Sequence, residues 1–236
     1  MSDTFALPLL EWRDIPAGRV TIVILAHYTE YNVKAFRIGK YPVTYAQFQA
    51  FVEAPDGFRS DVWWQGLDKR EAEPGQQRWP VDNHPRENVS WYDAVAFCRW
   101  LSNKTGLVIS LPTEQQWQRA AQGDDARQYP WGKLFDESRC NQQDNLWHST
   151  TPVDKYPDGA SPYGVYDMAG NVMEWCLNEY KNPSYVGFIG NADRVLRGGY
   201  YDDSWASAQC FSRHWDAPDA RRPFIGFRIV AVSSPY

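Results

Sequence analysis

The sequence predicts an α+β protein that is rich in loops and carries short strands beside a few capped helices. Three observations indicate this fold class. Helix-start patterns occur at three places in the first half of the chain, β-branched stretches lie around them, and aromatic residues make up 16% of the chain, with 12 Trp. Such an aromatic content is typical of irregular segments pinned by large rings. Because no repeat or linker separates two cores, we expect one domain over residues 1–236.

The expected strands are short. Residues 15–24 combine a Pro-Ala-Gly turn with a β-branched run, which predicts a turn followed by a strand. Residues 33–38 alternate apolar and polar side chains, as a half-buried strand does, and we expect the two strands to form a hairpin. Further strands are expected at residues 194–197 and 225–232, and a weak helical periodicity covers residues 170–176.

The expected helices have recognisable starts. Two capping boxes predict helix N-termini, because each N-cap hydroxyl is followed three residues later by a glutamine that can return the hydrogen bond. A further helix is expected to begin at Ser90, whose hydroxyl can accept the N–H of Asp93 and whose partner carboxylate suits the positive helix start. Gly106 is expected to end that helix. The capping-box pairs are Thr44 with Gln47 and Thr113 with Gln116.

The composition excludes some classes of partner. The net charge of −5 disfavours a nucleic-acid-binding face, which needs clustered basic residues. No apolar stretch approaches the roughly 20 residues that span a bilayer, and the start of the chain lacks the pattern of a secretory signal. We therefore expect no nucleic-acid partner and no membrane span. The location stays unknown, with a cytoplasmic or a phage- or prophage-encoded protein as the expectation.

The cysteines are widely spaced and form no CxxC pair. We interpret them as buried free thiols, with two disulfides as the alternative. They are Cys98, Cys140, Cys176 and Cys210.

Six motifs follow one another along the chain, at residues 38–48, 88–94, 111–120, 129–132 and 164–175, and in a terminal frame made of residues 194–199 and 225–228. They resemble, in this order, the motifs of the formylglycine-generating-enzyme (sulfatase-modifying factor) family. The resemblance covers roughly residues 12–232. It implies an irregular C-type-lectin-like fold with two main helices, short antiparallel strands and long ordered loops. It does not imply one function, because one scaffold can carry several.

The chain departs from the family at the oxidase site. The resemblance implies two cysteines, four and nine residues after the Gly-Gly pair, but Asp203 and Ala208 hold these positions. A thiolate pair is what binds Cu(I), and neither a carboxylate nor a methyl group replaces it. The 4 histidines also lack the spacing of the iron-binding triad in the sulfoxide-synthase branch. We therefore expect no catalytic residues, no required cofactor and a packed thiol at Cys210.

A structural calcium ion is the one cofactor that the resemblance suggests. Mapped residue by residue, its ligands would be the side chains of Asp167 and Glu174 and the carbonyl oxygens of Gly170 and Val172. Carboxylate and carbonyl oxygens are the donors that Ca²⁺ takes. The alternative is that both carboxylates accept backbone N–H groups in a tight turn.

Residues 200–224, enclosed by the terminal frame and called here the 200–224 segment, are the candidate binding region. They carry large aromatic side chains among acidic, basic and small ones. Rigid aromatics beside adaptable polar groups are typical of interface hot spots and antibody paratopes. The candidate ligand-binding residues, expected to be exposed, are Tyr201, Asp203, Trp205, Ser207, Phe211, His214, Trp215, Asp216, Arg222 and Phe224.

The frame also resembles the variable proteins of diversity-generating retroelements, in which template asparagine codons (AAC) are mutated at adenine. With the register set on Arg213, Pro218, Arg221 and Ile225, every residue at a template-asparagine position is reachable from AAC by changes at adenines alone. Glu, Lys and Met, which are not reachable, are absent from the segment, whereas Trp205, Gln209 and Trp215 would need other template codons. The template-asparagine positions are Asp202, Asp203, Ser204, Ala206, Ser207, Ser212, His214, Asp216, Ala217, Asp219, Ala220, Arg222, Pro223 and Phe224.

We therefore expect a non-enzymatic protein that binds an unknown protein or cell-surface ligand through the 200–224 segment. One alternative is an oxidative enzyme of the same superfamily with an altered active site, for which a redox metal and a deep pocket near Cys210 would be evidence. The other is a sensor or effector domain of a larger protein, which the full-length gene would decide.

Overall fold

The computed structural model describes residues 9–24, 26–143 and 147–233. Each of the three α-helices in this part of the chain has a side-chain cap at its N-terminus. Each N-cap hydroxyl accepts the N–H three residues later, and the side chain at that later position accepts the N–H of the N-cap. Gly106 ends the second helix with φ 70°, a left-handed conformation that glycine adopts without strain. These findings confirm the expected helix starts and stop. The helices are α1 (Tyr45–Glu53), α2 (Trp91–Thr105) and α3 (Glu114–Gln122).

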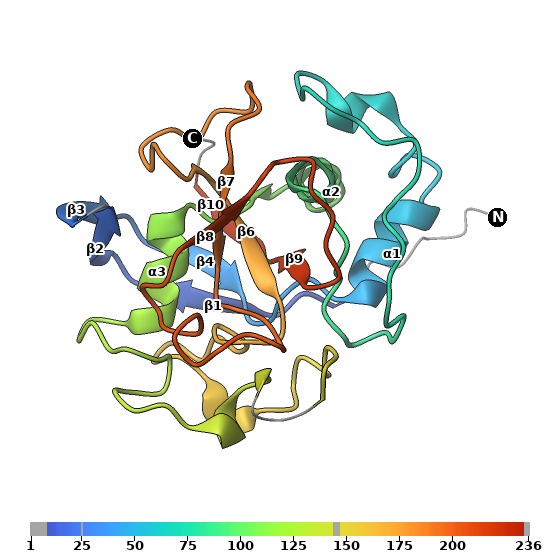
Figure 1. Ribbon diagram of the computed structural model, residues 1–236. Helices are drawn as coiled ribbons and strands as arrows, with labels where there is room; N and C mark the ends of the chain where they lie inside the picture. The colour runs from blue at the N-terminus through green and yellow to red at the C-terminus, as the bar shows by residue number, and fades with distance from the viewer. Residues whose placement is uncertain (1–8, 25, 144–146, 234–236) are drawn as a thin grey trace.

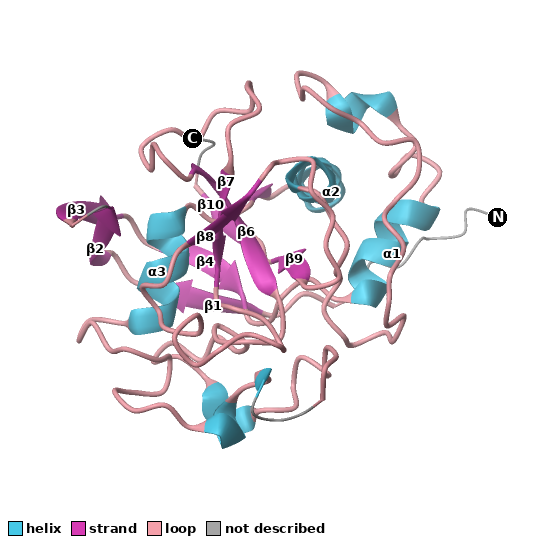
Figure 2. Cartoon of the chain, in the orientation of Figure 1, coloured by secondary structure: helices cyan, strands magenta, loops and turns pink. Residues whose placement is uncertain are grey.

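The described strands form two four-stranded sheets and a separate hairpin. Neighbouring strands pair antiparallel, apart from β6 and β9, which are parallel. Figure 2 shows how much of the remaining chain is loop. In spatial order the first sheet has β1 (Trp12–Ile15), β4 (Phe36–Gly39), β10 (Val230–Val232) and β5 (Val108–Ser110), the second has β8 (His214–Asp216), β7 (Arg194–Arg197), β6 (Met173–Glu179) and β9 (Ile225–Phe227), and the hairpin has β2 (Gly18–Ile24) and β3 (His27–Val33).

The expected N-terminal hairpin forms with a different partner strand. β2 pairs along its full length with β3, whereas residues 33–38 are divided between the end of β3 and the start of β4. Lys34 and Ala35 carry the chain from the hairpin into the first sheet, so the predicted single strand is wrong. Most residues of β3 are exposed and polar, and the strand therefore lacks the alternation that would reveal it.

Two other expected elements also differ from the structure. Residues 225–232 form two strands in different sheets, because Arg228 between them turns its side chain inward to Glu174. Residues 170–176 are not helical but lead into β6. Nearly all side chains of β6 are buried, and a strand covered on both faces shows no period of two.

The second sheet is packed on both faces. Successive residues of β7, Val195 and Leu196, belong to different apolar clusters. α1 and α2 supply one cluster, in which the rings of Phe48 and Phe97 stack with centroids 5.6 Å apart. α3 supplies the other cluster through Trp117. Figure 1 shows α3 on one side of the strands and the other two helices on the other side, so the sheet is a fixed platform.

The four cysteines are buried and form no disulfide, which confirms the interpretation as thiols. Among the described residues, no helix has both the length and the apolar character that crossing a membrane requires.

Candidate ligand-binding surface

The 200–224 segment lies across the second sheet. Its strand β8 pairs with β7, with Trp215 opposite Val195, and the chain then continues to α2, where the N–H of Trp91 donates to the carbonyl oxygen of Pro218 at 3.0 Å. Figure 1 shows the segment in orange and red, passing in front of β6 and β7. Because β8 is the edge strand of a sheet that is packed on both faces, the segment is attached to a rigid base.

Two arginines anchor the segment to helix N-termini. Nε and Nη2 of Arg213 donate to the carboxylate of Glu114, at 2.5 and 2.9 Å, and Nη2 also donates to the carbonyl oxygen of Tyr180. Arg221 donates to both carboxylate oxygens of Asp93 at 2.8 Å. Bidentate arginine–carboxylate contacts fix geometry as well as contributing energy. The residues that set the sequence register therefore have structural partners.

Burial separates the template-asparagine positions of the 200–224 segment from a set of other positions in it. None of the template-asparagine positions is buried; each is exposed or half-buried. The buried residues of the segment all lie outside that set, and they are Tyr201, Ala208, Gln209, Cys210 and Pro218.

Most of the candidate ligand-binding residues are accessible. Trp205, Phe211 and Trp215 are about half exposed, at 52%, 47% and 54%. Arg222 is exposed as well, and the remaining polar candidates and Phe224 are half-buried. These half-buried candidates are Asp203, Ser207, His214, Asp216 and Phe224.

Tyr201 is the exception, because it is only 3% exposed and the expectation that it faces solvent is wrong. Its ring packs edge-on against Trp79 and Tyr200, at centroid distances of 5.2 and 5.4 Å. The neighbouring Tyr200 in turn stacks on Phe224 at 4.3 Å. This ring cluster ties the two ends of the segment together, and composition alone does not distinguish such a ring from an exposed one.

Two polar atoms of the segment are buried and unpaired. Oδ2 of Asp203 and Nε2 of His214 have no hydrogen-bond partner among the described residues. Burial lowers the pKa of His214, so its imidazole is neutral near pH 7. An unpaired buried polar atom is costly until a partner is supplied. A rearrangement that pairs these two atoms would therefore be favourable.

Sequence reasoning missed the contribution of residues outside the 200–224 segment. Nδ1 of His148 lies 2.5 Å from Oδ1 of Asp202, although the two residues are far apart in the chain. Trp147 next to it is 54% exposed. No local pattern in the sequence indicates this contact, because it depends on how two loops meet.

The positions of the family's cysteine pair carry no cysteine in this chain. Ala208 is buried, and Asp203 contributes a carboxylate. Cys210 is fully buried, and burial raises the pKa of its thiol to about 12. A thiol rather than a thiolate is therefore present near neutral pH, and the thiolate is the reactive and metal-binding form. The described residues contain no group of three His, Cys, Asp or Glu side chains placed to hold a metal ion.

The residues mapped for calcium are arranged around a different cation. Nε and Nη2 of Arg228 donate to the two carboxylate oxygens of Glu174, both at 2.6 Å, and Trp117 Nε1 donates to the same carboxylate at 2.7 Å. Asp167 accepts a hydrogen bond from Asn171, and burial raises its pKa to about 7. A carboxylate already paired with a guanidinium does not fit the calcium site in this arrangement. Calcium binding stays an untested prediction.

Comparisons with known proteins agree with the fold. A profile of the sulfatase-modifying factor enzyme 1-like domain matches residues 15–232. Serine/threonine-protein kinase pkn1 of Chlamydia caviae is 32% identical over 224 residues, covering 85% of this chain and 34% of that protein. Hercynine oxygenase of Mycobacterium tuberculosis is 32% identical over 236 residues, covering 84% of this chain and 53% of that protein. The chain thus spans from one third to about half of the length of these relatives.

A solved structure shows the same architecture. Treponema denticola variable protein 1 superposes with a TM-score of 0.72 at 23% identity, over 93% of this chain and 94% of that one. The likeness confirms the expected α+β, C-type-lectin-like fold. At this level of identity it carries no information on activity or ligand.

Proposed function

The chain belongs to the sulfatase-modifying factor enzyme 1-like domain family, and we propose that it is a non-enzymatic, ligand-binding member whose 200–224 segment is a diversified surface on a rigid scaffold. The proposed ligand is a protein or another cell-surface molecule. The segment would supply the contact area, and the rest of the fold would hold it in place.

The observation that carries this proposal is the burial pattern of the segment. Positions assigned to template asparagines from the resemblance of the frame avoid the interior, while the buried residues fall at the other positions. A protein that tolerates many residue types at a site must keep that site out of its core, because core substitutions that change volume are destabilising. All template-asparagine positions therefore fall among the positions of the segment that are not buried.

The chemistry of the surface supports binding. Trp205, Phe211 and Trp215 offer rigid apolar area, and large aromatics are enriched at interface hot spots. Asp203, Asp216 and Arg222 add partly or fully exposed charged side chains. Because the segment is anchored on packed elements, it loses little conformational entropy when it binds.

The decisive experiment is to sequence the genomic DNA on both sides of the gene. The proposal expects a reverse-transcriptase gene and a near-copy of the codons for residues 200–224 that differs almost only at adenines. A near-copy with differences at all four bases, or no copy within the locus, would contradict diversification. The chain would then be a member of the family without a diversified segment.

A binding experiment tests the surface itself. The purified protein is used to select binders from a displayed random-peptide library, and the selected peptides are then measured against variants. Trp215→Ala should weaken most of them, whereas Tyr28→Ala, which removes an exposed aromatic side chain from β3, should not. A single hot-spot aromatic typically contributes about 2 kcal/mol, or roughly thirtyfold in affinity. If the peptides bind Trp215→Ala and Asp203→Ala as tightly as the wild type, the binding surface lies elsewhere.

The similarity to hercynine oxygenase favours one competing proposal, an oxidative enzyme with a different metal site. Metal analysis of the purified protein together with oxygen consumption would separate it from a binder. A domain that serves a larger chain is a further proposal, since the relatives are two to three times as long. The full gene sequence decides it, and it is compatible with a binding role.

A further inference from the structure

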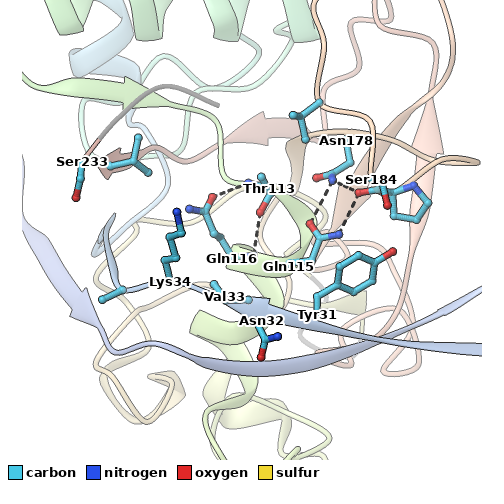
Figure 3. A pocket seen from close by; sticks show the side chains of 14 residues that line it. Tyr31, Asn32, Val33, Lys34, Thr113, Gln115, Gln116, Asn178, Ser184 and Ser233 are labelled. Carbon is cyan, nitrogen blue, oxygen red and sulfur yellow. Dashed lines mark hydrogen bonds between the residues drawn. The ribbon is translucent and has the colours of Figure 1, made fainter.

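A cavity of about 600 Å³ lies outside the 200–224 segment. It is enclosed by the end of β3 and the link to β4, the start of α3, the loop after β6 and the end of β10. Figure 3 shows the side chains that line it. The volume falls in the range of small-molecule sites, which is about 300–1,000 Å³. Its apolar lining comes from Val33, Ala35, Pro183, Val186 and Val232.

One wall of the cavity is held by an amide network. Nε2 of Gln115 donates to the carbonyl oxygen of Pro183 at 3.0 Å, and its Oε1 accepts from Nδ2 of Asn178 at 3.2 Å. Oδ1 of Asn178 accepts the N–H of Glu114 at 2.5 Å, next to the N-cap Thr113. The network joins the loop after β6 to the start of α3. The wall is therefore preformed, and a ligand does not have to order it.

The charge of the cavity is unbalanced. Lys34 is the one charged residue among those that line it, and Lys34 makes no ion pair within the described part of the chain. In Figure 3 its amino group is directed into the hollow, toward Gln116. A second hollow, at residues 131–139, contrasts with this one, because Lys133 and Arg139 are balanced there by Asp136 and Glu137.

We propose that the cavity binds a small organic carboxylate with an apolar body. The carboxylate would pair with the ammonium group of Lys34, and the apolar body would lie against the aliphatic lining between β3 and the loop after β6. Charge-assisted hydrogen bonds to ammonium groups are among the stronger polar contacts. The site shares no residue with the 200–224 segment, so the two proposals stand or fall separately.

The test uses 4-phenylbutyrate and its neutral analogue 4-phenylbutanol as probes in an NMR titration of the ¹⁵N-labelled protein. A ligand of about 12 non-hydrogen atoms at about 0.3–0.4 kcal/mol per atom gives a Kd on the order of 1 mM. Chemical-shift changes should concentrate at residues that line the cavity. The butanol should bind about two- to fivefold more weakly, which corresponds to one partly exposed charge pair.

Variants separate the role of charge from simple apolar binding. Lys34→Gln should reduce the affinity for 4-phenylbutyrate about two- to fivefold and leave that for the butanol unchanged. Lys133→Gln, which removes an equally exposed lysine beside the second hollow, should change neither. No shifts at the lining residues up to about 10 mM, roughly ten times the expected Kd, would overturn the site. Equal binding of acid and alcohol, insensitive to Lys34→Gln, would overturn the ligand class.

Discussion

Two arginine–carboxylate pairs show how differently the same chemistry is used in two regions. Arg228 and Glu174 are fully buried and make two contacts of 2.6 Å, supported by Trp117. Arg222 and Asp216 lie on the 200–224 segment, with the arginine 52% exposed, and their closest contact is 2.9 Å. The first pair links β6 to the chain after β9 and, through Arg228, to the turn at Asp167. The second pair lies at the solvent-exposed surface, where other residue types can replace it.

Burial and hydrogen-bond partners, rather than residue type, distinguish the scaffold from the binding surface. Trp175 is fully buried and donates to the carbonyl oxygen of Val89, while Trp215 is half exposed and its ring centroid lies 6.2 Å from that of Tyr180. The hydrogen bond of Trp175 and the pair of Arg228 with Glu174 are buried scaffold contacts, and removing one partner of such a contact costs energy.

Breaking the buried pair should have the largest effect. Glu174→Gln leaves the Arg228 guanidinium buried without a counter-charge, and we expect a loss of about 3–5 kcal/mol in the free energy of unfolding. Asp216→Asn, the matched change in the exposed pair, should cost less than about 1 kcal/mol. Urea denaturation of both variants measures the difference. Similar losses would remove the distinction between the two regions.

Removing an anchor should have an intermediate effect and join the two regions experimentally. Arg213→Ala takes away two hydrogen bonds to Glu114, which then keeps only Arg197 at 2.9 Å. Hydrogen bonds to charged groups contribute about 1.5–3 kcal/mol, so a loss of about 2 kcal/mol is expected. Amide hydrogen exchange should speed up in β8 before it does in β6. Uniform acceleration across the sheet would show that Arg213 is not a local anchor.

The surface should also respond to pH through His214. Burial lowers its folded-state pKa below the usual 6.5, so the unfolded chain takes up the proton first as pH falls. The stability that this neutral histidine contributes is present above about pH 6.5 and is lost as pH decreases toward the folded-state pKa. The stability of the wild type relative to His214→Gln should therefore decrease between about pH 8 and pH 5. A difference in urea midpoint between wild type and His214→Gln that is the same at both ends of this pH range would contradict the prediction.

The smallest effect on stability is expected at the exposed aromatics. Trp215→Ala should change the free energy of unfolding by no more than about 0.5 kcal/mol, because surface substitutions away from special contacts are nearly neutral. Trp175→Ala, at a fully buried position, should cost about 3–5 kcal/mol. Thermal and urea unfolding of the two variants provide the comparison. A large loss at Trp215 would assign it to the scaffold.

The sequence predicted the parts of this protein that depend on local rules. The capping residues Thr44, Ser90 and Thr113 and the terminating Gly106 act within one helical turn, so their roles could be read directly. The family motifs supplied the fold. The sequence did not predict β3, because its side chains are mainly exposed. It also did not predict that residues 225–232 form two strands, which depends on the inward turn of Arg228.

The candidate site was predictable in outline and not in detail. Codon chemistry and composition pointed to the 200–224 segment, and most of its candidates are accessible. The burial of Tyr201 depends on Trp79, and the contact of Asp202 depends on His148, both distant in sequence. The lysine-lined cavity combines four separate segments of the chain. Tertiary contacts of this kind leave no local pattern.

The most direct test of the account is a comparison of two libraries in the 200–224 segment, displayed on yeast and sorted for resistance to protease. One library randomises the template-asparagine positions, and the other randomises Tyr201, Ala208, Gln209, Cys210 and Pro218. The account predicts that most members of the first library stay folded and that few members of the second do, since only the second alters buried side chains. Equal survival of the two libraries would contradict a replaceable surface on a fixed scaffold.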